Sequence, residues 1–269
     1  MIEPEVPPTI EIHSGYSIQL AASSRNVEWR SDNPSVATVS STGLVTAKGK
    51  GKAVIYTYAS EEKQDIVCYL DVYPRRNILF YIGADDNLIN SDTPGKINQI
   101  RSGWQPDKGE LLIYADRQGE GAFLLRVNNI PDANGYYGLD TLAVYGAENS
   151  ADAAMLTRSI NKMISDYPAD SYGMIFFSHA SGWLPQGALN RPRSMVIDGG
   201  NEMEYTDFAS AIPDGQFDFI IFEACLMADV MSMYELRNKT EYILASSAEI
   251  VSPGFHDIYK EKIMNLFDT

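Results

Sequence analysis

Two residues that could perform chemistry stand at the ends of apolar runs in the second half of the chain. His179 follows the run 173–178 and leads into a Ser-Gly turn, and Cys225 follows the run 217–222. Continuous apolar runs of this length are typical of strands buried on both faces, as in a parallel sheet. Because ligands bind at the carboxyl ends of the strands in such a sheet, both residues are predicted to lie where a site forms.

A cysteine paired with a histidine can carry out nucleophilic catalysis. The thiolate is the nucleophile, and a free cysteine ionises only near pH ~8.5, so a helix N-terminus or a nearby imidazole must favour the anion. An imidazole with an ordinary pKa of ~6.5 can also protonate a leaving amine. The gap of 46 residues between His179 and Cys225 has room for one crossover helix with its loops. A lone cysteine at a strand end is usually core and a lone histidine is usually at the surface, so it is the coincidence of the two that favours function.

The surrounding elements predict an alternation of strands and helices. Further apolar strands are expected over 77–84 and 110–115, and helices over 150–167, 205–212 and 226–237. Ser150 is the predicted N-cap of the first helix, whose inward positions are Ala154, Ile160, Met163 and Ile164. Cys225 then stands where the third helix begins. This alternation indicates a βαβ sheet.

Residues 9–73 follow a different pattern, that of an all-β module. Short alternating runs are separated by turn signals such as Asp32-Asn33-Pro34 and Ser41-Thr42-Gly43, which predicts a β-sandwich. The expected strands cover 10–20, 27–30, 36–39, 44–46, 53–58 and 66–72. The Tyr73-Pro74 break marks the boundary, and the polar, Pro-rich residues 1–8 have the character of a linker after a removed leader.

The chain has two cysteines, and each needs its own explanation. Ile66, Cys68, Leu70 and Val72 fall on one face of the last predicted strand of the sandwich, so Cys68 is interpreted as a buried small hydrophobe. Because Cys68 and Cys225 lie in different predicted domains, a disulfide framework is not expected.

Charge and motif content exclude several classes of function. The net charge of −15 argues against binding to nucleic acid or to anionic membranes and suits basic partners. No apolar run is long enough for a transmembrane helix. His13, His179 and His256 show no metal-ligand spacing, and no Gly-x-Ser-x-Gly elbow is present.

The stretch 27–39, which includes Trp29, Asn33 and Pro34, continues through 43–47 to a Gly-rich turn and the run 53–55. It resembles the bacterial Ig-like domain, group 2, over residues 9–73. The resemblance implies a secreted or surface-exposed spacer or adhesion module.

The stretches 174–183 and 217–228, which end in His179-Ala180-Ser181-Gly182-Trp183 and Glu223-Ala224-Cys225-Leu226, resemble the clostripain family of cysteine peptidases in the caspase-like clan. The segments 79–88, 198–200, 205–208, 242–250 and 253–255 agree, so the resemblance covers 77–269. It implies an α/β domain with a mostly parallel sheet flanked by helices. It also implies that His179 is the general acid/base, that Cys225 is the nucleophile, and that the N–H groups of Ala180 and Cys225 form the oxyanion hole.

By the same resemblance, the acidic residue two positions before the cysteine receives Arg or Lys at P1. Here that residue is Glu223, one methylene longer than the usual Asp, and a buried carboxylate could pair bidentately with an incoming guanidinium. An internal salt bridge or a solvent-facing Glu223 remains the alternative. Ser247 and Glu249, in the segment after the cysteine, are further substrate-binding candidates.

Family members often cleave themselves between the two catalytic residues and often use calcium. Arg193-Ser194 is the candidate processing site, because Pro192 blocks cleavage after Arg191; a plain basic surface loop is the alternative. No cofactor is required by the residues themselves, and the carboxylates Asp85, Asp86 and Asp198 show no recognisable calcium-loop spacing.

The sequence therefore predicts a secreted or surface-attached cysteine endopeptidase that cleaves proteins or peptides after Arg or Lys, with any anchor outside this sequence. Three departures from the family favour the alternative of a non-catalytic surface binding or adhesion protein with a degenerate peptidase domain. Ala180 stands where the clan usually has Gly, Glu223 stands where the family has Asp, and the chain ends soon after Cys225, so that 77–269 is expected to be C-terminally incomplete.

Overall fold

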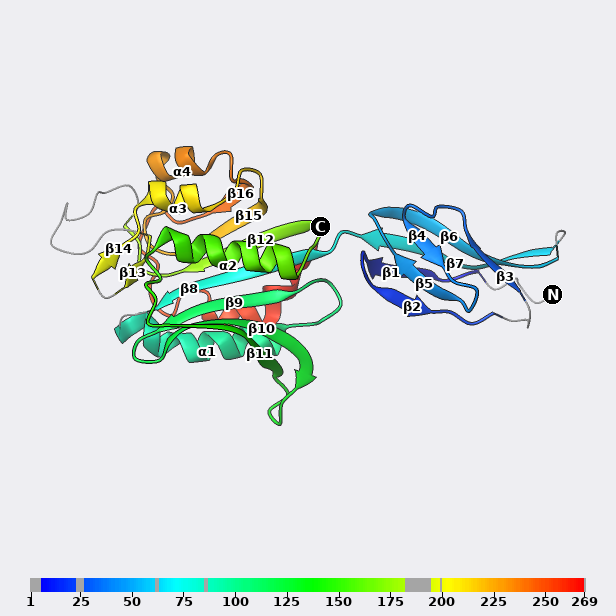
Figure 1. Cartoon of the computed structure of the whole chain (residues 1–269), viewed down its shortest axis with the longest axis horizontal. Coiled ribbons are helices and arrows are strands. Elements are labelled where there is room, and N and C mark those ends of the chain that lie inside the picture. Colours follow the sequence, from blue (N-terminus) through cyan, green and yellow to red (C-terminus); the bar gives the residue numbers. More distant parts are fainter. Residues whose placement is uncertain are drawn as a thin grey trace. The chain divides into compact units, whose positions relative to one another are not determined.

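The computed structural model describes residues 6–22, 27–60, 63–84, 87–181, 195–198 and 200–268. The chain divides into two compact units, and the division falls between Arg75 and Arg76 (Figure 1). No helix within these described ranges has the length and apolar character that crossing a membrane requires.

The N-terminal unit is a sandwich of two small sheets. Its strands are β1 (Thr9–His13), β2 (Ser17–Gln19), β3 (Glu28–Ser31), β4 (Ala37–Val39), β5 (Leu44–Ala47), β6 (Gly51–Ser60) and β7 (Lys63–Tyr73). One sheet has the order β1-β7-β6-β3 and the other β2-β5-β4. Ile55, Cys68 and Leu70 are buried between them, so the predicted all-β sandwich is confirmed.

Cys68 lies in this core as predicted, 1% exposed, and burial raises the pKa of its thiol. Ile66 does not share the buried face, because its side chain is 42% exposed. The β6–β7 register shifts between Ile55 and Tyr56, where Ile55 pairs with Cys68 but Tyr56 pairs with Ile66. This irregularity breaks the alternation that the sequence pattern assumed.

The second unit is built on a seven-stranded sheet of order β11-β10-β9-β8-β12-β15-β16. Its strands are β8 (Arg76–Ala84), β9 (Leu111–Arg117), β10 (Gly121–Pro131), β11 (Tyr137–Gly146), β12 (Ser171–Phe177), β15 (Phe217–Glu223) and β16 (Thr240–Leu244). Neighbouring strands from β9 to β16 run parallel, and β9, β10 and β11 form an antiparallel edge. A separate ribbon pairs β13 (Ile197–Asp198) with β14 (Asn201–Glu202).

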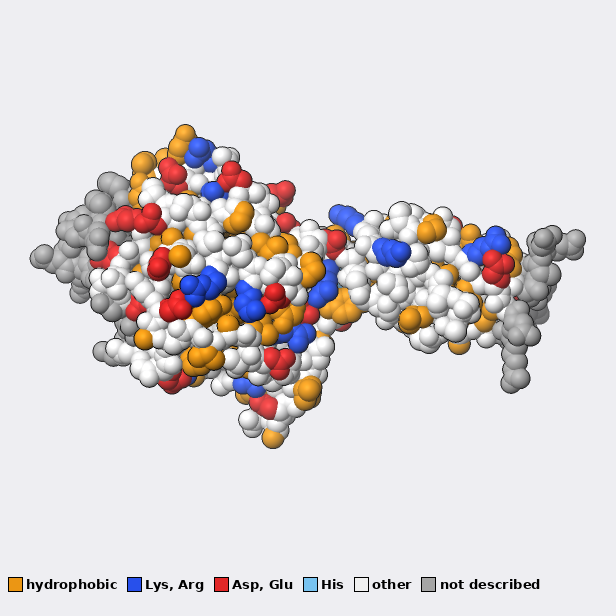
Figure 2. All heavy atoms as spheres, in the orientation of Figure 1, with side chains coloured by type: hydrophobic (Ala, Val, Ile, Leu, Met, Phe, Trp, Pro, Cys, Tyr) orange, Lys and Arg blue, Asp and Glu red, His pale blue; other side chains and the backbone are white. Residues whose placement is uncertain are grey.

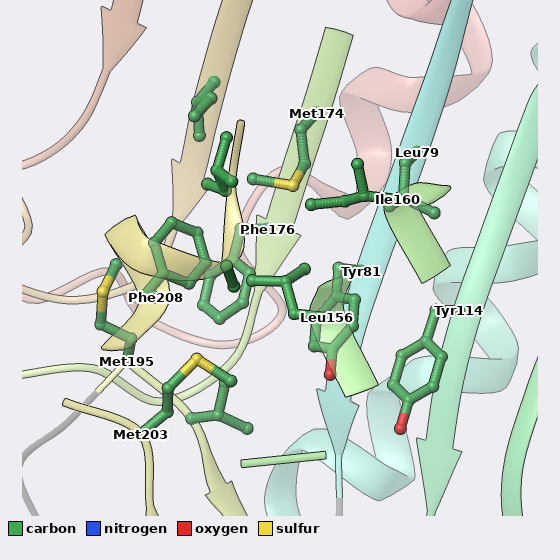
Figure 3. Packing of buried hydrophobic residues seen from close by; sticks show 14 of the residues in the cluster. Leu79, Tyr81, Tyr114, Leu156, Ile160, Met174, Phe176, Met195, Met203 and Phe208 are labelled. Atoms are coloured by element: carbon green, nitrogen blue, oxygen red, sulfur yellow. The ribbon is translucent and has the colours of Figure 1, made fainter. Parts of the chain in front are cut away.

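Helices cover both faces of this sheet (Figure 1). One face packs against α2 (Ala153–Asp166), α3 (Tyr205–Ala211) and α4 (Val230–Leu236), and the other against α1 (Asn87–Gly103), α5 (His256–Lys262) and η1 (Ile263–Phe267). Consecutive strand residues point to opposite layers: Phe176 joins the first core and Phe177 the second. Figure 3 shows Tyr81, Tyr114, Phe176 and Phe208 packed in the first core with Leu156 of α2. The predicted parallel sheet, buried on both faces, is confirmed.

Helix boundaries differ from those predicted. Asp152, not Ser150, caps α2 by accepting the N–H of Ala154, and Ala154 is exposed instead of inward-facing. Ser150 is fully buried with its backbone N–H donated to Asp198. The periodic pattern of apolar residues did not show where the helix begins to within two residues. The β10–β11 hairpin, α1, β16 and α5 had no counterpart among the predicted elements.

Charges of both signs alternate on the outer surface of this unit, as Figure 2 shows for one face. On α2, Arg158 lies 2.8 Å from Glu148 and Lys162 lies 2.7 Å from Asp166. Exposed pairs of this kind contribute little to stability, so the fold depends on the two buried layers.

Asp152→Ala tests the cap of α2. Losing the acceptor for the Ala154 N–H should lower the free energy of unfolding by about 1 kcal/mol. Urea unfolding of the full chain, followed by helical circular dichroism, measures this change. Asp107→Ala, the same change at an exposed loop position, is the control, and an equal loss in both variants would contradict the capping role.

Candidate active site

The two strands that lead to His179 and Cys225 are direct neighbours in the sheet. β12 and β15 pair in parallel, and Phe177 stands opposite Glu223 in their register. His179 and Cys225 each follow two residues after this pair, at the same carboxyl edge of the sheet. Adjacent strands lie about 4.8 Å apart, so the two chain ends leave the sheet side by side. Both residues are half-buried.

Cys225 occupies a tight turn and not the start of a helix. The predicted helix from residue 226 begins only at Val230, where Asp229 caps it by accepting the N–H groups of Met231 and Ser232. The residues between are held instead by a neighbouring segment, because Leu226 donates its N–H to Ala248 and Ala228 donates to Ser246. Cys225 therefore does not stand at the N-terminus of α4.

Leu226, directly after the cysteine, adopts a left-handed conformation with φ of 59°. It is the sole non-glycine residue with positive φ in the part of the chain that the structure describes. This conformation costs about 1–2 kcal/mol for an L-residue, so it persists only where the surroundings impose it. The hydrogen bonds to Ala248 and Ser246 provide that constraint, and the turn fixes where the thiol points.

The thiol contacts the backbone of Ile250. The N–H of Ile250 donates to Sγ at 3.3 Å, and the Ile250 carbonyl lies 3.6 Å from Sγ, within reach of the thiol proton. An N–H donor bonds more strongly to an anionic acceptor than to a neutral one, so Ile250 is placed to support a thiolate. The sequence pattern did not indicate this backbone contact.

The backbone at Ala180 is compatible with the residue present. Since φ is not left-handed there, Ala in place of the family's usual Gly causes no strain of that kind. Within the described residues, no acceptor is recorded for the N–H groups of Ala180 or Cys225. Both proposed oxyanion donors thus retain an N–H that a ligand could use.

Glu223 is fully enclosed and has its own partners. Lys96 Nζ donates to Oε1 at 2.5 Å, with both side chains 0% exposed. The N–H of Phe255 also donates to Oε1, and the Tyr259 hydroxyl donates to Oε2, each at 2.5 Å. This geometry is the internal salt bridge that the sequence left as an alternative to the role of a P1 receptor.

Burial dominates the electrostatics of this cluster. It lowers the pKa of Lys96, and the nearby Glu223 carboxylate opposes that shift. Burial, followed by the charge of Glu223, raises the pKa of Tyr259 well above its usual value. Lys96 also lies 3.9 Å from the ring centroid of Phe177 and donates to the Pro253 carbonyl. No spacing pattern pointed to Lys96, which is 127 residues away in sequence.

The structure places some of the remaining predicted residues, and the others lie outside the described residues. Ser247 and Glu249 are exposed in the segment that runs beside Cys225. Arg193 and Ser194, like Asp85 and Asp86, lie outside the described residues. Asp198 accepts the Ser150 N–H and lines a cleft of about 320 Å³ with Asp116, Glu120 and Glu148. Among the side chains that the structure places, no group of three or more His, Cys, Asp or Glu is arranged to hold a metal ion.

A mostly parallel sheet with helices on both faces, and with Cys225 and His179 at its carboxyl edge, is the α/β arrangement expected of a caspase-like domain. Residues 80–265 match the clostripain family, and residues 14–67 match the bacterial Ig-like domain, group 2. The chain belongs to the clostripain family and carries a bacterial Ig-like domain. Both predicted resemblances are confirmed.

Several relatives support this assignment. Clostripain of Hathewaya histolytica is 24% identical over 212 residues, which cover 66% of this chain and 40% of that protein. A secreted C11 cysteine protease from Bacteroides thetaiotaomicron, solved with an irreversible peptide inhibitor, is 35% identical with a TM-score of 0.63. An inactive zymogen C11 protease from Parabacteroides distasonis is 32% identical with a TM-score of 0.62. Each structural match covers 73% of this chain and 55% of the other, so the chain spans about half the length of these relatives.

Leu226 variants test the turn that presents the thiol. Leu226→Gly should unfold at a urea concentration equal to or above that of the parent chain, because glycine adopts positive φ without strain. Leu226→Val should lose about 1 kcal/mol, because a β-branched residue is poorly compatible with this conformation. Leu244→Val, on the edge strand, is the control for the same change of residue type, and a Leu226→Val variant no less stable than the control would contradict the assignment of strain.

Proposed function

We propose that this chain is a cysteine endopeptidase in which His179 and Cys225 form the catalytic dyad. The observation that carries the proposal is the parallel pairing of β12 and β15, with both residues two positions beyond the Phe177–Glu223 pair. Membership of the clostripain family supports the same chemistry. Proteins or peptides are the substrates expected for this class.

The proposed reaction follows from the groups at this edge. Sγ of Cys225 attacks the scissile carbonyl carbon while His179 holds the thiol proton, and the C–N bond breaks as His179 passes that proton to the leaving amine. The N–H groups of Cys225 and Ala180 stabilise the oxyanion of each tetrahedral intermediate. A water molecule, deprotonated by His179, then hydrolyses the acyl-enzyme and restores the thiol.

The location of the enzyme and the role of its N-terminal unit are proposed from its relatives and from the Ig-like domain. A relative described as a secreted C11 protease supports an extracellular location. The Ig-like unit would then act as a spacer or as a contact with a surface. The family resemblance implies use of calcium and self-cleavage at Arg193–Ser194, and that cleavage would require the site to accept Arg at P1. The predicted Arg or Lys preference depends on Glu223, whose contacts favour a different specificity, argued below.

A non-catalytic binding protein is the second candidate, and one observation favours it. Both the N–H and the carbonyl of Ile250 contact Sγ, so that this segment lies against the nucleophile. In a peptidase this segment must move or share the thiol with substrate. In a binding protein the segment can stay in contact with the thiol.

Cys225→Ala and His179→Ala distinguish the two candidates. Each should reduce hydrolysis of a mixed fluorogenic peptide library by about a thousandfold or more, because the nucleophile and the acid/base act as one unit. Release of fluorophore by the full chain at pH 6–8, with and without calcium, is the measurement. Cys68→Ala removes the other thiol, which is buried in the Ig-like core, and should leave the rate unchanged.

If Cys225→Ala still hydrolyses the library, His179 and Cys225 are not the catalytic dyad. If the parent chain releases no fluorophore, and peptide chloromethyl ketones fail to label Cys225 by mass spectrometry, the binding protein is favoured. The variants must retain the thermal unfolding midpoint of the parent chain for either conclusion.

A further inference from the structure

We propose that Lys96 sets the P1 specificity of this peptidase by neutralising Glu223, so that the site accepts an uncharged P1 side chain and not Arg or Lys. The inference rests on the proposed peptidase function and assigns its substrate class. Lys96 acts through Glu223 and is a specificity-determining residue without being a catalytic one.

The position of Glu223 is where a charge would matter for P1. It ends β15 two residues before Cys225, and Phe177 pairs with it across the sheet two residues before His179. A side chain here lies directly beneath the edge at which the scissile bond would be held. A carboxylate with open acceptor positions would favour a substrate cation at this point.

Those acceptor positions are taken by groups of the chain itself. Oε1 receives Lys96 Nζ and the Phe255 N–H, and Oε2 receives the Tyr259 hydroxyl. The three donors come from α1, α5 and the segment before α5, so they enclose the carboxylate from separate elements. The side chains of Lys96 and Glu223 are both 0% exposed, so the carboxylate cannot be reached from solvent.

The space around the carboxylate is also filled. A Cβ atom added at Gly254 would stand 2.2 Å from Glu223 Oε1 and 2.9 Å from its Cδ. Gly254 has φ of 67°, so glycine is required there both by conformation and by this contact. Where one methyl group does not fit, a guanidinium does not fit without displacing part of the cluster.

Displacement would be unfavourable because Lys96 would lose its counterion while still buried. The other contacts of its ammonium are the Pro253 carbonyl and the faces of Phe177 and Tyr259, which carry no charge. Asp92 is a further carboxylate that acts on Lys96, but its recorded hydrogen bond is to the Ser252 hydroxyl. Removing one partner of a buried ion pair is strongly unfavourable. Lys96 is, moreover, held in place by its helix, so it competes with substrate at a high effective concentration. The charge beneath P1 is therefore cancelled within the protein.

The test uses two irreversible probes that differ only at P1, peptidyl acyloxymethyl ketones with arginine or norleucine. The measurement is the second-order rate constant for alkylation of Cys225 in the full chain, read by intact mass. The norleucine probe should react faster than the arginine probe with the parent chain. Lys96→Met, which keeps the stem but removes the ammonium, should shift the rate ratio toward arginine by at least tenfold, because Glu223 then lacks its counterion.

Lys162→Met is the matched control, since it removes an exposed lysine paired with Asp166 on α2. It should leave the ratio unchanged. If Lys96→Met does not fold, the double variant Lys96→Met with Glu223→Gln removes both buried charges. This double variant should keep the parent's preference for norleucine, whereas a preference for arginine would overturn the role of the charge pair.

The outcomes separate this inference from the proposed function. Faster labelling of the parent chain by the arginine probe would overturn the inference and leave the peptidase intact. A new N-terminus at Ser194 after incubation, absent in Cys225→Ala, would overturn it in the same way, because Arg193 would then have occupied P1. If neither probe labels Cys225, both the proposed peptidase function and the proposed specificity are contradicted.

Discussion

The parallel register between β12 and β15 is the constraint from which the candidate site follows. Once Phe177 and Glu223 are opposite one another, His179 and Cys225 must leave the sheet at neighbouring points of one edge. No side-chain contact is needed to bring them together, because the backbone ladder does so. The apolar residues of both strands secure that ladder by filling the cores on either face.

This burial on both faces also explains why Glu223 requires a lysine. A carboxylate at the end of such a strand points into an apolar layer, where an unpaired charge is unfavourable. Lys96, Tyr259 and the Phe255 N–H supply one opposite charge and two further donors, which is the complete form of pairing that a buried ion requires. The proposed absence of a charged P1 pocket thus follows from the pairing that the buried Glu223 carboxylate requires within the fold.

The sequence predicted those parts of the structure that depend on local pattern. The four apolar strands, the sandwich and the placement of His179 and Cys225 at strand ends came from runs and turn signals that neighbouring residues determine. The start of α4, the left-handed Leu226 and the pairing of Lys96 with Glu223 did not, because each depends on a segment distant in sequence. Residues 226–229 have the composition of a helix start, but the segment 246–250 takes their backbone hydrogen bonds. Ser150 was predicted as the cap of α2 from its residue type, but it is buried in the structure and Asp152 caps the helix instead.

One segment of the chain contacts both the proposed nucleophile, Cys225, and the buried carboxylate of Glu223. Ser246, Ala248 and Ile250 contact the turn that holds Cys225, and a few residues later the Phe255 N–H contacts Glu223 while Pro253 contacts Lys96. A change that freed Glu223 would loosen the end of this segment, and its other end fixes the strained conformation of Leu226. The charge beneath P1 and the position of the thiol are therefore not independent properties. A substrate cation could be accommodated at Glu223 only by disturbing the segment that holds the proposed nucleophile, which is the physical reason for expecting an uncharged P1 residue.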